Sequence, residues 1–140
     1  MAGYSKTPLV KKLGIKPGFR LILLDAPEHY GQTLGELPES VTVADTLTGS
    51  FDFIQFFTTR RETLVGRFPQ LKKALTAAGT LWISWPKRAS KVETDLTENV
   101  IRDIGLDNGL VDVKVVAVDE VWSGLKFVYR LTDRPNVERR

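Results

Sequence analysis

The sequence predicts a small α/β protein in which helices cover both faces of a mainly parallel sheet that ends in an antiparallel hairpin. Stretches of strand length alternate with stretches of helical periodicity, as in parallel strands joined by crossovers. Residues 19–24 are apolar on both faces apart from Arg20, which is typical of a strand buried on both sides. The last two strand candidates are separated by a single turn signal, which indicates a hairpin.

The N-terminal residues predict a short helix that leads into this first strand. Thr7 suits the helix cap and Pro8 the first helical position, and Gly14 would end the helix. The segment Lys16-Pro17-Gly18 is a turn signal directly before the strand.

The next segment, residues 25–39, is polar and broken by prolines and glycines. We expect a short helix near residues 32–37 and a brief strand over 41–43. Residues 51–57 predict a stronger strand, because five of the seven are apolar and four of these are aromatic.

A longer helix is predicted after Thr58 or Thr59, either of which would cap it, because the apolar residues that follow recur at helical spacing as far as Ala78. Pro69 should kink or split this helix, and Gly79 should end it. A third strong strand is expected directly after this glycine, over residues 80–85.

The C-terminal third predicts one more helix and the hairpin. Residues 95–98 resemble a capping box with Asp95 as the cap. Strands are expected over 111–121 and 125–131, with Ser123-Gly124 as the turn and one antiparallel strand at the sheet edge. These elements make up a small three-layer Rossmann-like sandwich.

Length and composition predict a single domain. The chain has 140 residues and no cysteine; we expect a single domain over residues 1–140, with an ordered core over about 7–133 and a basic C-terminal tail. No signal-peptide pattern opens the sequence, and the longest apolar run, residues 21–24, is far too short for a membrane span. We therefore expect a cytoplasmic protein with no membrane partner.

The fold class selects the candidate site, because open sheets of this kind bind ligands beyond the carboxyl ends of their strands. Each candidate also has a structural explanation: Asp25 could cap a turn, and Trp122 could pack in the core. Lys87 and Arg88 follow the third strong strand and precede a helix, a place where an anion can be held. The candidate ligand-binding residues, each of which follows a predicted strand, are Asp25, His29, Arg60, Lys87, Arg88 and Trp122.

Several chemistries are excluded by what the sequence lacks. Without cysteine there are no thiolate metal sites or thiol nucleophiles, and His29, the one histidine, cannot form a histidine metal site. No G-x-G-x-x-G follows the first strand, and neither a P-loop nor a G-x-S-x-G elbow is present. We expect no catalytic residue, no metal and no cofactor.

Four segments spread along the chain form a combined pattern: Leu13-Gly14-Ile15-Lys16-Pro17-Gly18, Leu81-Trp82, Pro86-Lys87 and Trp122-Ser123-Gly124. Together these segments resemble a bacterial family known as domain of unknown function 3052. The resemblance covers most of the chain and implies a single domain to which no activity is assigned, so it adds no catalytic residue.

Three further segments stand in the order of a turn, a strand and a helix end: Lys16-Pro17-Gly18, Phe51-Asp52 and Ala78-Gly79-Thr80-Leu81. This order loosely resembles that of S-adenosylmethionine-dependent methyltransferases. The family's glycine-rich loop is replaced here by residues 25–30, and residues 26–50 are too short for a full strand–helix–strand cofactor half. The resemblance implies a truncated relative that has lost, or never had, that cofactor.

Three functions follow from these observations. We expect first a non-catalytic binding or interaction protein, whose partner is an anionic small molecule or another protein; the apolar edge of the hairpin also leaves a homodimer open. The alternative is a divergent methyltransferase-like enzyme with residual S-adenosylmethionine binding. The second alternative is weak nucleic-acid binding through residues 6–20, which contain five cations and no acid. Nucleic acid ranks last because the net charge is only +3 and aromatic residues are few there.

Overall fold

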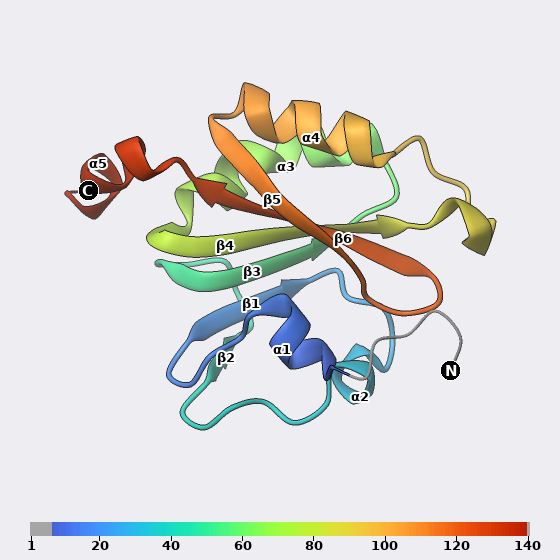
Figure 1. The fold of residues 1–140 in the computed structure, drawn as a ribbon, viewed down its shortest axis with the longest axis horizontal. Helices are drawn as coiled ribbons and strands as arrows, with labels where there is room; N and C mark the ends of the chain where they lie inside the picture. Colours follow the sequence, from blue (N-terminus) through green and yellow to red (C-terminus); the bar gives the residue numbers. More distant parts are fainter. Residues whose placement is uncertain (1–6, 140) are drawn as a thin grey trace.

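The structure, a computed structural model, describes residues 7–139. Its centre is a six-stranded sheet in the order β2-β1-β3-β4-β6-β5 (Figure 1). The first four of these strands are parallel to one another, and β6 is antiparallel to both β4 and β5. The strands are β1 Arg20–Leu24, β2 Thr42–Ala44, β3 Phe51–Phe57, β4 Leu75–Pro86, β5 Leu110–Ala117 and β6 Trp122–Tyr129.

Helices cover both faces, so the predicted three-layer Rossmann-like α/β sandwich is confirmed. In Figure 1, α3 and α4 lie on one side of the sheet and α1 and α2 on the other. One apolar cluster packs beneath α3 and α4, and a second packs beneath α1 and α2. The helices are α1 Leu9–Leu13, α2 Tyr30–Leu34, α3 Arg61–Lys73, α4 Glu98–Asp107 and α5 Arg134–Glu138, with single 3-10 turns at Arg88–Ser90 and Leu131–Asp133.

The C-terminal hairpin differs from the prediction in its place and its turn. Its second strand, β6, lies inside the sheet, and β5 is the edge strand. The reason is burial: Phe127 on β6 is fully buried, whereas Val113 on β5 is 54% exposed. The predicted turn residues Ser123 and Gly124 belong to β6. An added Cβ at Gly124 would lie 3.1 Å from the Trp82 ring, closer than an ordinary van der Waals contact, so the buried indole would have to shift.

The boundary between α3 and β4 also lies earlier than predicted. The helix ends at Lys73 and the strand begins at Leu75, which pairs with Phe51. Gly79 therefore lies within β4, where the register shifts and an added Cβ would meet the Phe51 carbonyl oxygen at 2.9 Å. The helix continues through Pro69, which is exposed; the buried stripe of α3 holds the helix together despite the missing amide.

Three helix caps were predicted wrongly. The cap of α4 is Thr97, whose hydroxyl accepts from the Val100 amide, and Asp95 lies outside the helix. At α3 the residue in the cap position is Arg60, which has no side-chain cap bond. At α1 the cap position is Pro8, likewise without a side-chain bond, although Gly14 ends the helix as predicted.

The segment after β1 is as short as predicted. It holds the five-residue α2, which begins two residues earlier than expected, and the three-residue β2. At the other end of the chain, α5 follows the last 3-10 turn, and its Val137 packs against the cluster beneath α3 and α4. None of the helices in the described residues is long and apolar enough to cross a membrane.

Candidate functional site

The carboxyl ends of β1, β3, β4 and β5 meet at one edge of the sheet, as predicted. The rings of Tyr30 after β1 and Phe57 at the end of β3 lie 4.8 Å apart, edge to face. The Phe57 ring lies 5.2 Å from that of Trp122, at the start of β6. After β4, the Lys87 amide donates to the Val121 carbonyl at 2.7 Å. Segments far apart in the sequence are therefore held together here.

A buried polar chain lies beneath this edge, on the α1 and α2 face. The Tyr30 hydroxyl donates to Gln55 Oε1 at 2.8 Å, and Gln55 Nε2 donates to the Ser84 hydroxyl at 3.1 Å. Both Gln55 and Ser84 are fully buried. Burial raises the pKa of Tyr30 well above its ordinary 10.0; the hydrogen bond between Tyr30 and Gln55 opposes this and the charge of Asp119 adds to it. The tyrosine is therefore a neutral hydrogen-bond donor in the folded protein.

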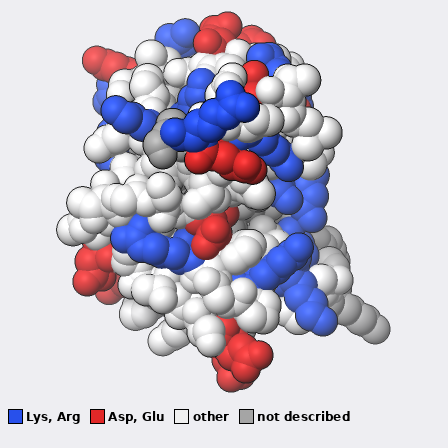
Figure 2. Space-filling view, turned by 90° about the vertical axis from the view of Figure 1, so that its left-hand side faces the viewer, with Lys and Arg blue, Asp and Glu red and all other residues white. Residues whose placement is uncertain are grey.

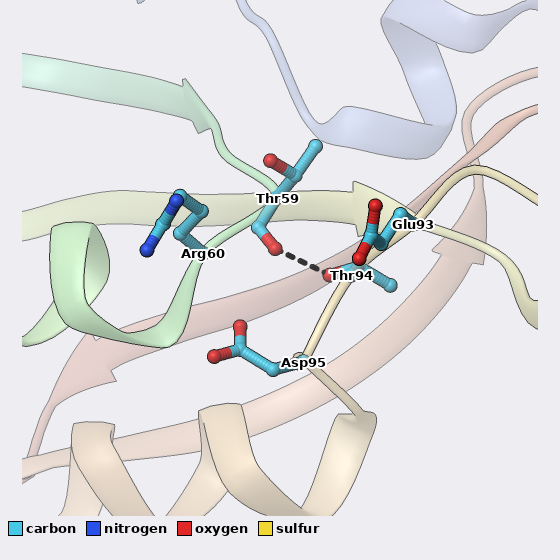
Figure 3. A pocket seen from close by; sticks show the side chains of 5 residues that line it. All are labelled: Thr59, Arg60, Glu93, Thr94 and Asp95. Carbon is cyan, nitrogen blue, oxygen red and sulfur yellow. Dashed lines mark hydrogen bonds between the residues drawn. The ribbon is translucent and has the colours of Figure 1, made fainter.

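One hollow at this edge, of about 390 Å³, lies beside the start of α3. Two of its lining residues are joined by a hydrogen bond of 2.6 Å from the Thr94 hydroxyl to the Thr59 carbonyl (Figure 3). The Asp95 carboxylate, which also lines it, accepts from the Arg61 amide at 2.7 Å and so occupies the N-terminus of α3. With Glu93 as a second acid and Arg60 as the one lining cation, this hollow does not favour an anion.

A second hollow, of about 370 Å³, lies beyond the carboxyl end of β4 and shares Thr94 with the first. Trp85 and Leu96 give it apolar walls, and Arg88 gives it a cation. Its far side is the N-terminus of α4, at Thr97 and Glu98. The Glu98 carboxylate is already paired with Arg102. The hollow therefore combines a cation, a helix N-terminus and an apolar wall, which are the features that hold a small anion.

The six predicted ligand-binding residues have different surroundings. Arg88 lines the second hollow, while Arg60 lines the first and lies 3.9 Å from Glu62. The Lys87 ammonium donates to the Asp119 carbonyl at 2.6 Å, which ties it to the β5–β6 turn. Their roles in binding stay predictions. Of the remaining three, Asp25 and His29 are exposed residues with left-handed φ angles of 55° and 66°, and Trp122 packs on Phe57.

Sequence reasoning missed the residues that shape the two hollows from the segment between β4 and α4. Thr94 there is hydrogen-bonded to Thr59, 35 residues earlier in the sequence, and Asp95 to Arg61, 34 residues earlier. No local pattern reveals such contacts. Gln55 and Ser84 did carry a signal, since each is a polar residue directly between apolar neighbours in a strand. Residues 7–139 place no group of three or more His, Cys, Asp or Glu side chains where they could hold a metal ion.

Comparison with solved structures shows that the fold is that of S-adenosylmethionine-dependent methyltransferases. DhpI in complex with SAH is similar to this chain with a TM-score of 0.60 and 10% identity, over 89% of this chain and 83% of DhpI. A SAM-dependent methyltransferase from Aquifex aeolicus gives a TM-score of 0.57 and 18% identity, over 85% and 86% of the two chains. Magnesium protoporphyrin IX methyltransferase from Synechocystis PCC 6803 gives 0.56 and 14%, over 87% and 78%.

Comparisons by sequence find nothing. No family model and no curated protein matches this chain. The resemblance to domain of unknown function 3052 therefore stays a prediction, while the looser resemblance to methyltransferases is confirmed at the level of the fold.

Proposed function

We propose that this chain is a non-catalytic binding protein that holds a small anionic molecule in the hollow beyond the carboxyl end of β4. The observation that carries the proposal is the position of Arg88, which lines that hollow together with the indole of Trp85 and the N-terminus of α4. In the part of the chain that the structure describes, the Arg88 guanidinium has no ion-pair partner. Its charge is thus free to meet a ligand.

The position of this hollow supports the proposal. It lies at the sheet edge where open α/β folds bind ligands, and its volume falls within the range of small-molecule sites, about 300–1,000 Å³. The neighbouring hollow has two carboxylates, so an anion is directed toward Arg88 and away from Arg60.

The fold favours a second candidate, an S-adenosylmethionine-dependent enzyme, because structures similar to this chain contain SAM or SAH. The turn after β1 does not fit such a cofactor. Its left-handed positions are Asp25 and His29, where glycines would let the backbone approach a ligand closely, and Glu28 adds a second exposed acid. The binding protein is therefore the better-supported function.

Thermal-shift and calorimetric titrations with inorganic phosphate, pyrophosphate and adenosine monophosphate test the proposal. A ligand that binds only the folded state raises the melting temperature, and a concentration 100 times Kd adds about 2.7 kcal/mol to the free energy of unfolding. We expect Arg88→Ala to remove the shift given by the best of these anions.

The matched control is Lys91→Ala, which removes one positive charge from the same exposed segment but does not line the hollow. This variant should keep the shift. The proposal fails if none of the three anions stabilises the protein, or if both variants lose the shift equally. Heat released by S-adenosylmethionine at millimolar concentration would favour the second candidate instead.

A further inference from the structure

On the α1 and α2 face, the amino half of β5 and the facing half of β6 lie outside the apolar cluster that these helices cover; Lys114 there is exposed, and Val111, Lys126 and Val128 are partly buried. Leu125, Phe127 and Tyr129 of β6 point into the cluster beneath α3 and α4, so Lys126 and Val128 point to the opposite face. The register pairs Lys126 with Lys114 and Val128 with Val111 of β5. Neither Val111 nor Val128 belongs to either apolar cluster.

This face carries an uncompensated positive charge. Lys114 and Lys126 are directly opposite each other on adjacent strands, an arrangement of like charges that destabilises a sheet. Lys16, from the turn before β1, is close enough to act on Lys126 as well: burial, then Lys114 and then Lys16, lower the pKa of Lys126. Among the described residues, no carboxylate forms an ion pair with any of the three lysines.

The basic side chains extend beyond this face. Figure 2 shows the molecule from the edge at which the parallel strands begin. Lys and Arg predominate along the right-hand side of this view, which is the front of Figure 1. Lys on an edge strand commonly prevents strand pairing, and the bulge at Val113 on β5 does the same. That explanation does not extend to Lys126, because β6 lies inside the sheet.

We propose that the face formed by Lys16, Val111, Lys114, Lys126 and Val128 docks an acidic amphipathic helix of a partner protein. Sheets of this class are covered by helices on both faces. Here the apolar cluster beneath α1 and α2 does not extend to the amino half of β5 and the facing half of β6. Glutamate or aspartate side chains of the partner would neutralise the three lysines, and apolar side chains on the same helix face would cover the two valines.

The mixture of side chains favours a protein over a nucleic acid. Phosphate backbones are bound by cations and hydrogen-bond donors, and valine offers them neither. The cationic groups of this face are all lysines, without the arginine forks or exposed aromatic rings that commonly hold nucleic acids. A second copy of this chain is also disfavoured, because β5 edges pairing with each other would bring like-charged lysines together.

The test uses a synthetic helical peptide of about 18 residues, or five turns, with leucines along one face and glutamates flanking them. A matched peptide carries lysines in place of the glutamates. We expect the acidic peptide to bind the full chain, with amide chemical-shift changes confined to β5, β6 and residues around 16. We expect no binding of the basic peptide.

Two variants locate the contact. Lys114→Gln and Lys126→Gln should each weaken the acidic peptide about three-fold, as loss of one partly exposed ion pair does, whereas Lys91→Gln, on a distant exposed segment, should not. Circular dichroism confirms that each variant is folded.

Three results would overturn the proposal. The first is equal binding of the two peptides, and the second is chemical-shift changes away from β5 and β6. The third is that a short DNA duplex binds more tightly than the acidic peptide. In that case the slope of log K against log salt concentration would become shallower by about 0.9 for each lysine removed. That last outcome would assign the face to nucleic acid.

Discussion

Asp95 shows how one residue can organise the candidate site from outside the helix it stabilises. Its carboxylate accepts from the first amide of α3 and joins the segment before α4 to that helix. The sequence pattern predicted Asp95 as the cap of α4, but the helix uses Thr97, two residues later. Both are good capping residues, so local sequence could not decide between them, and only the approach of α3 does.

Asp95→Ala should therefore destabilise α3. We expect the free energy of unfolding to fall by about 1 kcal/mol, the usual effect of losing a capping side chain, with faster hydrogen exchange at residues 61–64. Chemical denaturation and exchange measured together provide the test. The control is Asp103→Ala, which removes an exposed carboxylate of α4 that forms no ion pair within residues 7–139. A larger loss in the control would contradict this role for Asp95.

Tyr30 gives a prediction about pH. The pKa of Tyr30 is raised above 10.0 in the folded protein. Its hydroxyl therefore stays protonated at pH values at which the same tyrosine ionises in the unfolded chain. Above pH 10.0 the unfolded state then holds fewer protons, so stability falls as the pH rises. This contribution is fully present below the ordinary pKa.

Tyr30→Phe should remove that alkaline decrease and also lower stability at neutral pH. The neutral loss is about 1–3 kcal/mol, since Gln55 Oε1 is left buried without its donor. Denaturation at a series of pH values measures both effects. An unchanged alkaline slope in the variant would show that another group titrates.

Among the secondary-structure elements, α4 depends on a glycine for its contact with β6. A Cβ on Gly105 would lie 2.0 Å from the fully buried Phe127 ring, which also packs edge-to-face on Phe68. The helix can approach the sheet this closely only because residue 105 has no side chain.

Two matched glycine substitutions test this packing. Gly105→Ala should destabilise the protein by about 1–3 kcal/mol through overpacking. Gly66→Ala, in α3, meets nothing within 4 Å and should stabilise by up to about 1 kcal/mol, the difference in helix propensity. Urea denaturation of both variants compares them directly. Equal effects of the same sign would contradict the close contact between α4 and β6.

The elements themselves were predictable where one physical signal dominated. The aromatic strand β3 and the strand β1 were found because burial on both faces leaves a continuous apolar run. The α3–β4 boundary was not, because Leu75 fits both a helical stripe that continues to Ala78 and a strand that buries Leu75 and Ala77; pairing with β3 decides. In the hairpin, the glycine of Ser123-Gly124 indicated a turn, but it serves close packing against Trp82.

For the whole molecule, the edge that holds the site could be predicted from the order of the elements, but not its shape. Parallel strands bring Asp25, Arg60 and Arg88 to the same edge whatever their side chains do. The hollows depend on the segment between β4 and α4, whose contacts with Thr59 and Arg61 bridge distant parts of the sequence. The likeness to methyltransferases likewise fixes the architecture and leaves the ligand to be found from the site.

The most direct test of the central claim is an amide NMR titration of the full chain with pyrophosphate and, separately, with S-adenosylmethionine. The account predicts that pyrophosphate shifts resonances over residues 85–98, around Arg88 and the start of α4, and that S-adenosylmethionine leaves residues 25–31 unchanged. Shifts confined to residues 25–31 on addition of S-adenosylmethionine, with none near Arg88 from pyrophosphate, would contradict it.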